Sequence, residues 1–237
     1  MPKSKIIIAI ANNDISIDKS LMQLQVLAHD VHNVELQEWA ERELAGYPTE
    51  DVPDYRKATS LLLNYTGING SFNVKEAPLP LGFLDSETLE EISKVIVKED
   101  ISSIKEMSES NSGAHRDLSY LAGEVSEKTN GVVQCVSIRQ SIPNTLYKKI
   151  IAEVRNRIIK ALMILEERYG NLDNLGIAID EPKSYVGNLM INEALGLPQP
   201  SAPEPIHSKI AWKIIVPIIT AVAGGVIMAL INKIFNL

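Results

Sequence analysis

Apolar residues recur every three to four positions over residues 144–169, and this period predicts one unbroken helix. Asn144 or Thr145 is expected to cap its start, and Gly170 with Asn171 to end it. Burying most of its apolar face would contribute on the order of 10 kcal/mol before entropy is counted. We therefore expect this helix to run through the centre of the core.

Two shorter helices are predicted near the N-terminus, over residues 16–31 and 34–44. Ser16 or Asp18 is expected to cap the first, while Gly46 and Pro48 follow the second, as they commonly do where a helix ends. The second helix also has an acidic outer face, which is typical of a side exposed to water. The acidic residues are Glu35, Glu38, Glu41 and Glu43.

The middle of the chain alternates between strand-like and helical patterns. Residues 59–68 and 71–74 are predicted strands joined by an Asn69-Gly70 hairpin turn, and residues 132–142 form a second β region. Residues 85–98 are predicted to be helical, as is a short stretch around 101–107, with a loop over 108–113. The fold class is therefore α+β, mostly helical, with a small β component.

The C-terminal part of the chain has a different composition. Residues 214–231 contain no charge and would span roughly 27 Å as a helix, against a hydrocarbon core of about 30 Å. Trp212 and Lys213 precede this run, and Lys233 and Phe235 follow it, as anchors at the two interfaces would. We expect a transmembrane helix within 206–237; a buried core helix and a helix lying in the membrane surface are the alternatives.

This interpretation divides the chain into a cytosolic domain at 1–170, an irregular, proline-rich linker at 171–205 and the membrane segment at 206–237. No long element is predicted in the linker. Residues 6–11 resemble the apolar part of a signal peptide but are too few to act as one. We therefore expect a single-pass, tail-anchored protein of the inner (cytoplasmic) membrane, with its N-terminal domain in the cytosol.

Small residues recur every four positions within the predicted span, at Ala221, Gly225 and Ala229. Such a stripe lets two membrane helices approach closely. The expected partners are accordingly the lipid bilayer and further copies of the same chain.

Composition excludes several kinds of site. The net charge of −7 argues against binding nucleic acid through bulk positive charge. The single cysteine, Cys135, lies in an apolar stretch and is expected to be a small buried residue. His29 and His32 have no third ligand at a recognisable spacing, so no metal site is expected. No cofactor and no catalytic residues are predicted.

Two polar clusters remain. One runs from Trp39 to Pro48 and continues to Tyr55-Arg56, and the other is residues 153–157 within the long helix. We interpret them as a network of arginines and carboxylates, including Arg56 with Glu43, that clamps the second helix to the long one. The alternative is a polar binding pocket made of Tyr47, Tyr55, Arg56 and Arg155. The candidate binding residues are Trp39, Glu43, Tyr47, Tyr55, Arg56, Arg155 and Arg157.

The same clusters resemble the AbiTii domain of bacterial abortive-infection proteins, over roughly residues 16–170. Ala45 departs from the pattern, where a small polar residue is more usual. The resemblance implies an anti-phage role but transfers no active site. It rests on Glu35, Leu36, Trp39, Glu43, Leu44, Gly46, Tyr47, Pro48, Pro53, Tyr55 and Arg56, then on residues 154–157 and 165–167.

Together these features predict a non-enzymatic phage-defence effector. Its cytosolic domain would sense a signal or a partner from a defence system, and its tail would disrupt the membrane on self-association. The alternative is a tail-anchored adaptor that positions a partner protein at the membrane. A tethered hydrolase or nuclease is a third class, for which no acid–base or metal constellation stands out.

Overall fold

The computed structural model describes residues 3–49, 51–110, 114–177 and 181–200. Within them the fold is α+β and mostly helical, as the sequence predicts. No helix in this part of the chain is both long and apolar enough to cross a membrane. The predicted transmembrane helix at 206–237, with Ala221, Gly225 and Ala229, lies outside the described residues.

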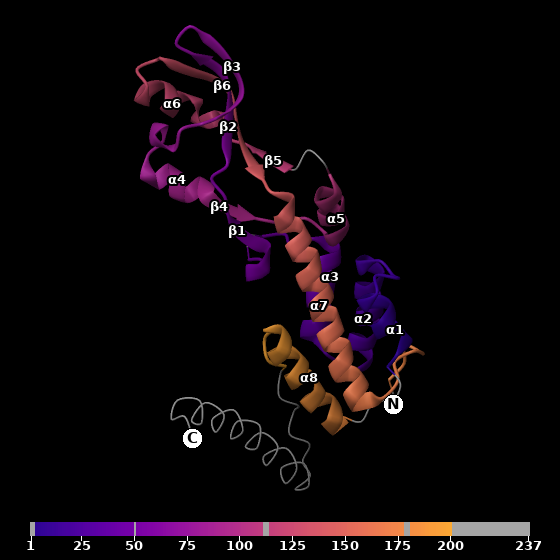
Figure 1. The fold of residues 1–237 in the computed structure, drawn as a ribbon. Helices are drawn as coiled ribbons and strands as arrows, with labels where there is room; N and C mark the ends of the chain where they lie inside the picture. The colour runs from indigo at the N-terminus through magenta and orange to yellow at the C-terminus, as the bar shows by residue number, and fades with distance from the viewer. Residues whose placement is uncertain (1–2, 50, 111–113, 178–180, 201–237) are drawn as a thin grey trace, which may run out of the picture.

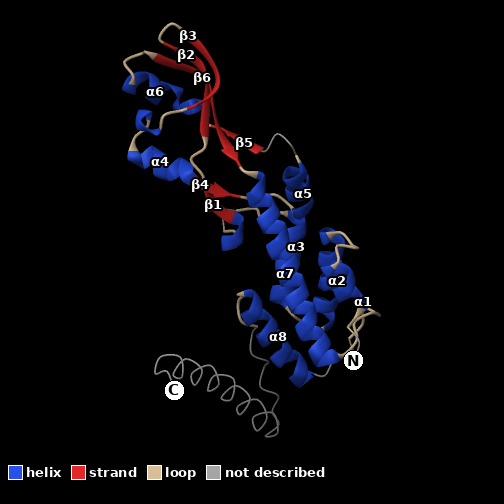
Figure 2. Ribbon diagram, viewed as in Figure 1, coloured by secondary structure: helices blue, strands red, loops and turns tan. Residues whose placement is uncertain are grey.

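Helices come at both ends of the described chain, and strands and shorter helices are interspersed between them (Figure 2). The helices are α1 (Lys5–Ala11), α2 (Ile17–Asp30), α3 (Val34–Ala45), α4 (Ser86–Ser93), α5 (Ile101–Glu109), α6 (Ala122–Lys128), α7 (Asn144–Tyr169) and α8 (Glu181–Leu195). The strands are β1 (Lys57–Thr59), β2 (Leu63–Asn69), β3 (Phe72–Pro78), β4 (Lys94–Ile96), β5 (Ala114–Asp117) and β6 (Val133–Ile142). Short 3₁₀ turns are η1 (Asp54–Arg56), η2 (Leu81–Phe83) and η3 (Ser119–Leu121).

These elements form two lobes, each with its own apolar core (Figure 1). In the β lobe, four antiparallel strands in the order β3-β2-β6-β5 form one sheet. The helices α4 and α6 lie against this sheet and supply Ile92 and Val125 to a core shared with Tyr65 and Ile138. The small β1–β4 ladder lies between the sheet and the helices (Figure 1).

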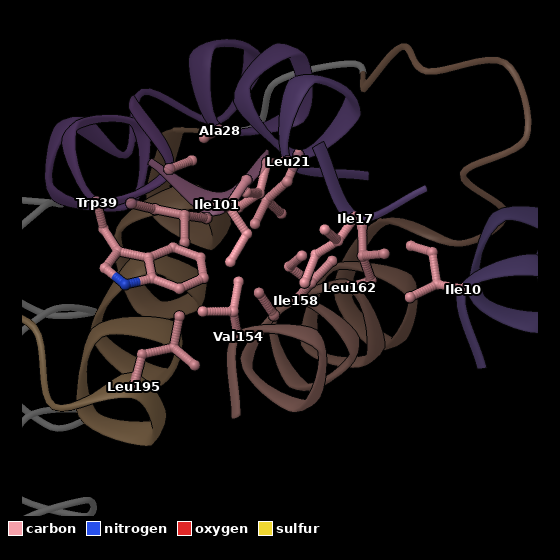
Figure 3. Packing of buried hydrophobic residues seen from close by; sticks show 14 of the residues in the cluster. Ile10, Ile17, Leu21, Ala28, Trp39, Ile101, Val154, Ile158, Leu162 and Leu195 are labelled. Carbon is pink, nitrogen blue, oxygen red and sulfur yellow. The ribbon is translucent and has the colours of Figure 1, made fainter. Parts of the chain in front are cut away.

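The helical lobe contains the larger core, built around α7 (Figure 3). Leu21 of α2, Trp39 of α3 and Ile101 of α5 all point toward Val154, Ile158 and Leu162 on α7. The long helix predicted at 144–169 is therefore confirmed, together with its central place in the core. Pro143, rather than Asn144 or Thr145, occupies its N-cap position, and the Asn144 side chain instead donates to the Ser110 carbonyl.

The lobes are joined by β6, which runs through Pro143 directly into α7. Because α1–α3 precede the β lobe in sequence and α7 and α8 follow it, the helical lobe is assembled from both ends of the described chain.

Several elements differ from the sequence predictions. Residues 6–11, considered only as a signal-like run, form most of α1, whose Ile6, Ile7 and Ile10 are buried. The helix expected over 85–98 ends at Ser93, because the next residues pair with β1 as strand β4. Elements β5 and α6 had no predicted counterpart, and α8 is a 15-residue helix in a segment where no long element was expected.

The N-terminus is fastened to the end of α7 by one carboxylate, Glu166. The Lys3 ammonium donates to its Oε2 at 2.8 Å, while the Ser4 amide and hydroxyl donate to Oε1 at 2.5 and 2.7 Å. The hydrogen bond from Lys3, followed by those from Ser4, lowers the pKa of Glu166 to about 2. The Glu166 carboxylate therefore stays ionised at neutral pH.

Replacing Glu166 with glutamine should lower the free energy of unfolding by about 1–2 kcal/mol at pH 7, because charged hydrogen bonds are lost. The contribution of Glu166 is present above its unfolded pKa of about 4.5 and is lost as the pH falls toward 2. In urea unfolding, the free energies of unfolding of wild type and Glu166→Gln should therefore differ more at pH 7 than at pH 3. Glu167→Gln, at an exposed neighbour, is the control and should behave as wild type.

Candidate functional site

The centre of the candidate site is the carboxylate of Glu43, which is fully buried on the last turn of α3. Its Oε1 accepts hydrogen bonds from the hydroxyls of Tyr47 and Tyr55, each at 2.7 Å, and from Arg56 Nε at 3.2 Å. Its Oε2 accepts from Arg56 Nη2 at 2.7 Å. Four donors therefore surround one carboxylate.

Arg56 is also fully buried and completes a bidentate ion pair with Glu43. Its Nη1 donates to the carbonyls of Val97, at 3.2 Å, and Glu99, at 2.7 Å. Burial lowers the pKa of Arg56, but the hydrogen bonds and the charge of Glu43 outweigh it, and the net shift is upward. The guanidinium thus stays charged and joins α3 to the segment between β4 and α5.

Tyr47 and Tyr55 extend the network in two directions. The Trp39 indole Nε1 donates to the Tyr55 hydroxyl at 2.9 Å, and the Arg56 guanidinium lies 4.7 Å above the Tyr47 ring centre. Burial, and then the charge of Glu43, raise the pKa of both tyrosines above the usual value of 10. Both hydroxyls are therefore held protonated as donors to the carboxylate.

Arg157 connects this network to the long helix. Its guanidinium lies 4.5 Å from the Tyr55 ring centre, while Nε donates to Glu153 at 2.9 Å. Arg155 lies two residues away, on a different side of α7, and is half-exposed. It forms no hydrogen bond or ion pair with the network among the described residues, so the pocket expected from Tyr47, Tyr55, Arg56 and Arg155 does not include Arg155. We call the other six residues, Trp39, Glu43, Tyr47, Tyr55, Arg56 and Arg157, the Glu43 cluster.

The local sequence explains how α3 and the turn after it place their side chains in the Glu43 cluster. Trp39 and Glu43 are four residues apart and so share one face of the helix. Gly46 then turns the chain with φ 86° and ψ 169°, a conformation open essentially only to glycine. The turn brings the Tyr47 amide within 2.8 Å of the Lys98 carbonyl, which fixes the tyrosine below the carboxylate.

The arrangement is closed rather than open. Every polar atom of Glu43 and Arg56 named above has a partner, and neither side chain is exposed. A hollow of about 580 Å³ in the described structure lies elsewhere, at the other end of α7 near Lys3, Lys160 and Glu166. The geometry therefore favours the predicted clamp, because the cluster binds α3, η1, the 97–99 segment and α7 to one another.

The remaining chemical candidates are dispersed. Cys135 is half-buried in β6, and burial raises the pKa of its thiol, which disfavours the reactive thiolate. His29 lies 3.7 Å from Asp30. Within the described part of the chain, no three His, Cys, Asp or Glu side chains gather as they would around a metal ion.

The sequence model of the AbiTii family matches residues 4–185, more than three quarters of the chain. The chain belongs to the AbiTii family. No curated protein and no solved structure matches it. The AbiTii assignment supports an abortive-infection, anti-phage role.

The cluster gives the recognisable AbiTii residues of this chain a physical role. Tyr47, Tyr55 and Arg56 donate to the Glu43 carboxylate, and Trp39 joins them through the Tyr55 hydroxyl. Sequence reasoning missed the acceptors of Arg56 Nη1, which are backbone carbonyls and carry no residue signature. It also missed the buried Ser184, Asn188 and Asn192 of α8, although their spacing of four was visible in the sequence.

Proposed function

We propose that this AbiTii protein is a membrane-anchored anti-phage effector without catalytic activity. In this proposal the AbiTii domain faces the cytosol and senses a signal or a protein partner, and the C-terminal segment self-associates and disrupts the inner membrane. The observation that carries it is the uncharged run at 214–231, which lies beyond the matched domain and behind a proline-rich stretch.

The closed geometry of the Glu43 cluster supports the non-catalytic part of the proposal. A general acid or base must reach a substrate proton, whereas the Glu43 carboxylate is enclosed by four donors from its own chain. The tyrosines beside it are likewise held in their protonated form. The most specific polar residues of the domain thus maintain its shape.

Removing the residues after 205 tests the function, because the shortened chain keeps every described element. We expect the full-length protein to collapse the membrane potential and stop growth on phage challenge, and the shortened chain to do neither. The measurement is growth together with membrane potential, each with and without phage. Depolarisation by the shortened chain, or a normal potential with full-length protein in the membrane fraction, would contradict the proposal; the latter result would leave the tail as a tether and favour the adaptor.

Gly225→Leu provides a matched variant within the intact tail. A leucine in the small-residue stripe keeps the segment apolar but blocks close helix approach. Crosslinked oligomers and depolarisation should both decrease, while membrane attachment remains. Unchanged crosslinking in this variant would remove self-association through the stripe from the proposal.

A further inference from the structure

The helix α8 docks onto the helical lobe through a polar stripe. Ser184, Asn188 and Asn192 are spaced by four residues, share one face and are all buried. The Ser184 hydroxyl and the Asn188 amide both donate to the Val31 carbonyl, the latter at 2.9 Å. Asn33, which caps α3 through its Oδ1, donates its amide to Asn192 Oδ1 at 3.0 Å. The polar face of α8 is thus hydrogen-bonded to the turn between α2 and α3.

A polar stripe holds a helix less firmly than an apolar one. When the helix is released, its neutral polar groups form hydrogen bonds with water instead. Each hydrogen bond to the lobe therefore favours the docked state by only about fivefold. Among the described side chains of α8, at 184–195, the buried apolar ones are Ile191 and Leu195, whereas α7 buries seven residues. The Oδ1 of Asn188 is also buried without a hydrogen-bond partner in the described structure. Release would return this atom to water.

The sequence of α8 further lowers its stability as an isolated helix. Gly187, Asn188 and Asn192 are poor helix formers, and two of them are adjacent near its middle. Its helical form therefore depends on docking, so undocking and unwinding are expected to occur together.

Further contacts of α8 hold residues 195–198 on the helical lobe. Arg157 Nη1 donates to the Leu195 carbonyl, and the Asn192 amide donates to the Pro198 carbonyl at 2.6 Å. Because Arg157 stacks on Tyr55, the last turn of α8 is connected to the Glu43 cluster. In Figure 3 the side chains of Leu195 and Trp39 lie close to Val154. Loss of α8 would thus expose an edge of the Trp39 indole.

We propose that α8 is a releasable latch, which holds the start of the C-terminal segment against the helical lobe until a trigger frees it. Release of the latch stands on the contacts above; its role in gating the tail rests on the proposed function. In the docked state Leu195 is held by Arg157 and Pro198 by Asn192. In the released state the C-terminal segment is free to reach other copies.

Hydrogen exchange on the full-length protein in detergent micelles tests the release itself. Amides of α8 should exchange at least about a hundredfold faster than those in the middle of α7. Ser184→Cys, which is nearly isosteric and of similar helix propensity, should accelerate exchange in α8 by about a further fivefold and leave α7 unchanged, because one strong docking hydrogen bond is lost. Asn156→Ala, at an exposed asparagine of α7, is the control and should change neither helix. Equal exchange of α8 and α7, or equal acceleration of both by Ser184→Cys, would overturn the latch.

A disulfide lock tests the gating. Asn33→Cys with Asn192→Cys, in a Cys135→Ala background, places two thiols where the native amides are hydrogen-bonded. Oxidation should slow α8 exchange and reduce leakage from liposomes containing the protein at least tenfold, and a reductant should restore both. With Asn192→Cys alone, neither the oxidant nor the reductant should change exchange or leakage. Slowed exchange with undiminished leakage would overturn the gating role. Absence of leakage from every form, the native chain included, would contradict the membrane function, and the exchange data would still decide the latch.

Discussion

Replacing Arg56 with methionine should lower the free energy of unfolding by about 3–5 kcal/mol, the largest effect we expect from one side chain. The substitution removes two of the four donors to Glu43 and leaves its carboxylate fully buried without a cation. It also leaves the carbonyls of Val97 and Glu99 without their donor. Urea unfolding followed by circular dichroism is the measurement.

Two further variants make this result specific. Arg42→Met removes an exposed arginine, whose contact with Glu38 is 3.7 Å, and should change stability by less than about 0.5 kcal/mol. Glu43→Leu combined with Arg56→Met should lose less than the sum of the two single changes, since no lone charge is left in the core. A loss below about 1 kcal/mol for Arg56→Met would mean that the cluster does not hold these elements together.

Gly46→Ala should be the second most damaging change, with a loss of about 2–4 kcal/mol in the free energy of unfolding. The φ of 86° and ψ of 169° at this position are strained for any other residue. An alanine Cβ would also lie 2.9 Å from the Lys98 carbonyl oxygen and 3.2 Å from the Asp100 nitrogen, both of which are backbone atoms that cannot swing away. The turn that places Tyr47 against Glu43 would therefore open.

Gly131→Ala separates the two contributions. Gly131 also has a positive φ, 77°, but a Cβ there would meet nothing within 4 Å. Its loss should be about 1 kcal/mol, from the backbone conformation alone. Thermal unfolding of the two variants side by side gives the comparison; equal losses would show that the approach of Lys98 to Gly46 contributes nothing.

The sequence predicted those features that depend on local periodicity or on charge pairing. The apolar period of residues 144–169 specified α7, since nothing in the tertiary structure competes with it. The Glu43–Arg56 pair was among the predicted arginine–carboxylate contacts, but placing Glu43 on the water-exposed face of the 34–44 helix was wrong, because Arg56 and the two tyrosine hydroxyls hold its carboxylate in the interior. Arg157 stacks on Tyr55, while Arg155 shares its motif but lies on a different side of α7.

Other features depend on contacts between distant residues and could not be predicted. Val95 belongs to a helical pattern, yet it lies in β4 because Ala58 of β1 pairs with it. The buried asparagines of α8 gave a polar pattern, and a polar face ordinarily indicates exposure to water. Burial of that face is favourable because the carbonyls of Val31 and Pro198 and the amide of Asn33 supply hydrogen-bond partners to it.

The discontinuous helical lobe has a consequence for synthesis on the ribosome. Chains generally fold from the N-terminus as they emerge, but α2 and α3 bury their apolar faces against α7, more than a hundred residues later in sequence. The β lobe has its own core and lies between them in sequence, so it can fold first. Meanwhile the surfaces of α1–α3 that pack on α7 stay exposed to water. The helical lobe then closes only when α7 has been made, shortly before the apolar C-terminal residues emerge. Nascent chains are thus exposed to aggregation mainly in the interval between α3 and α7, and a chaperone that covers α2 and α3 during this interval would improve the yield.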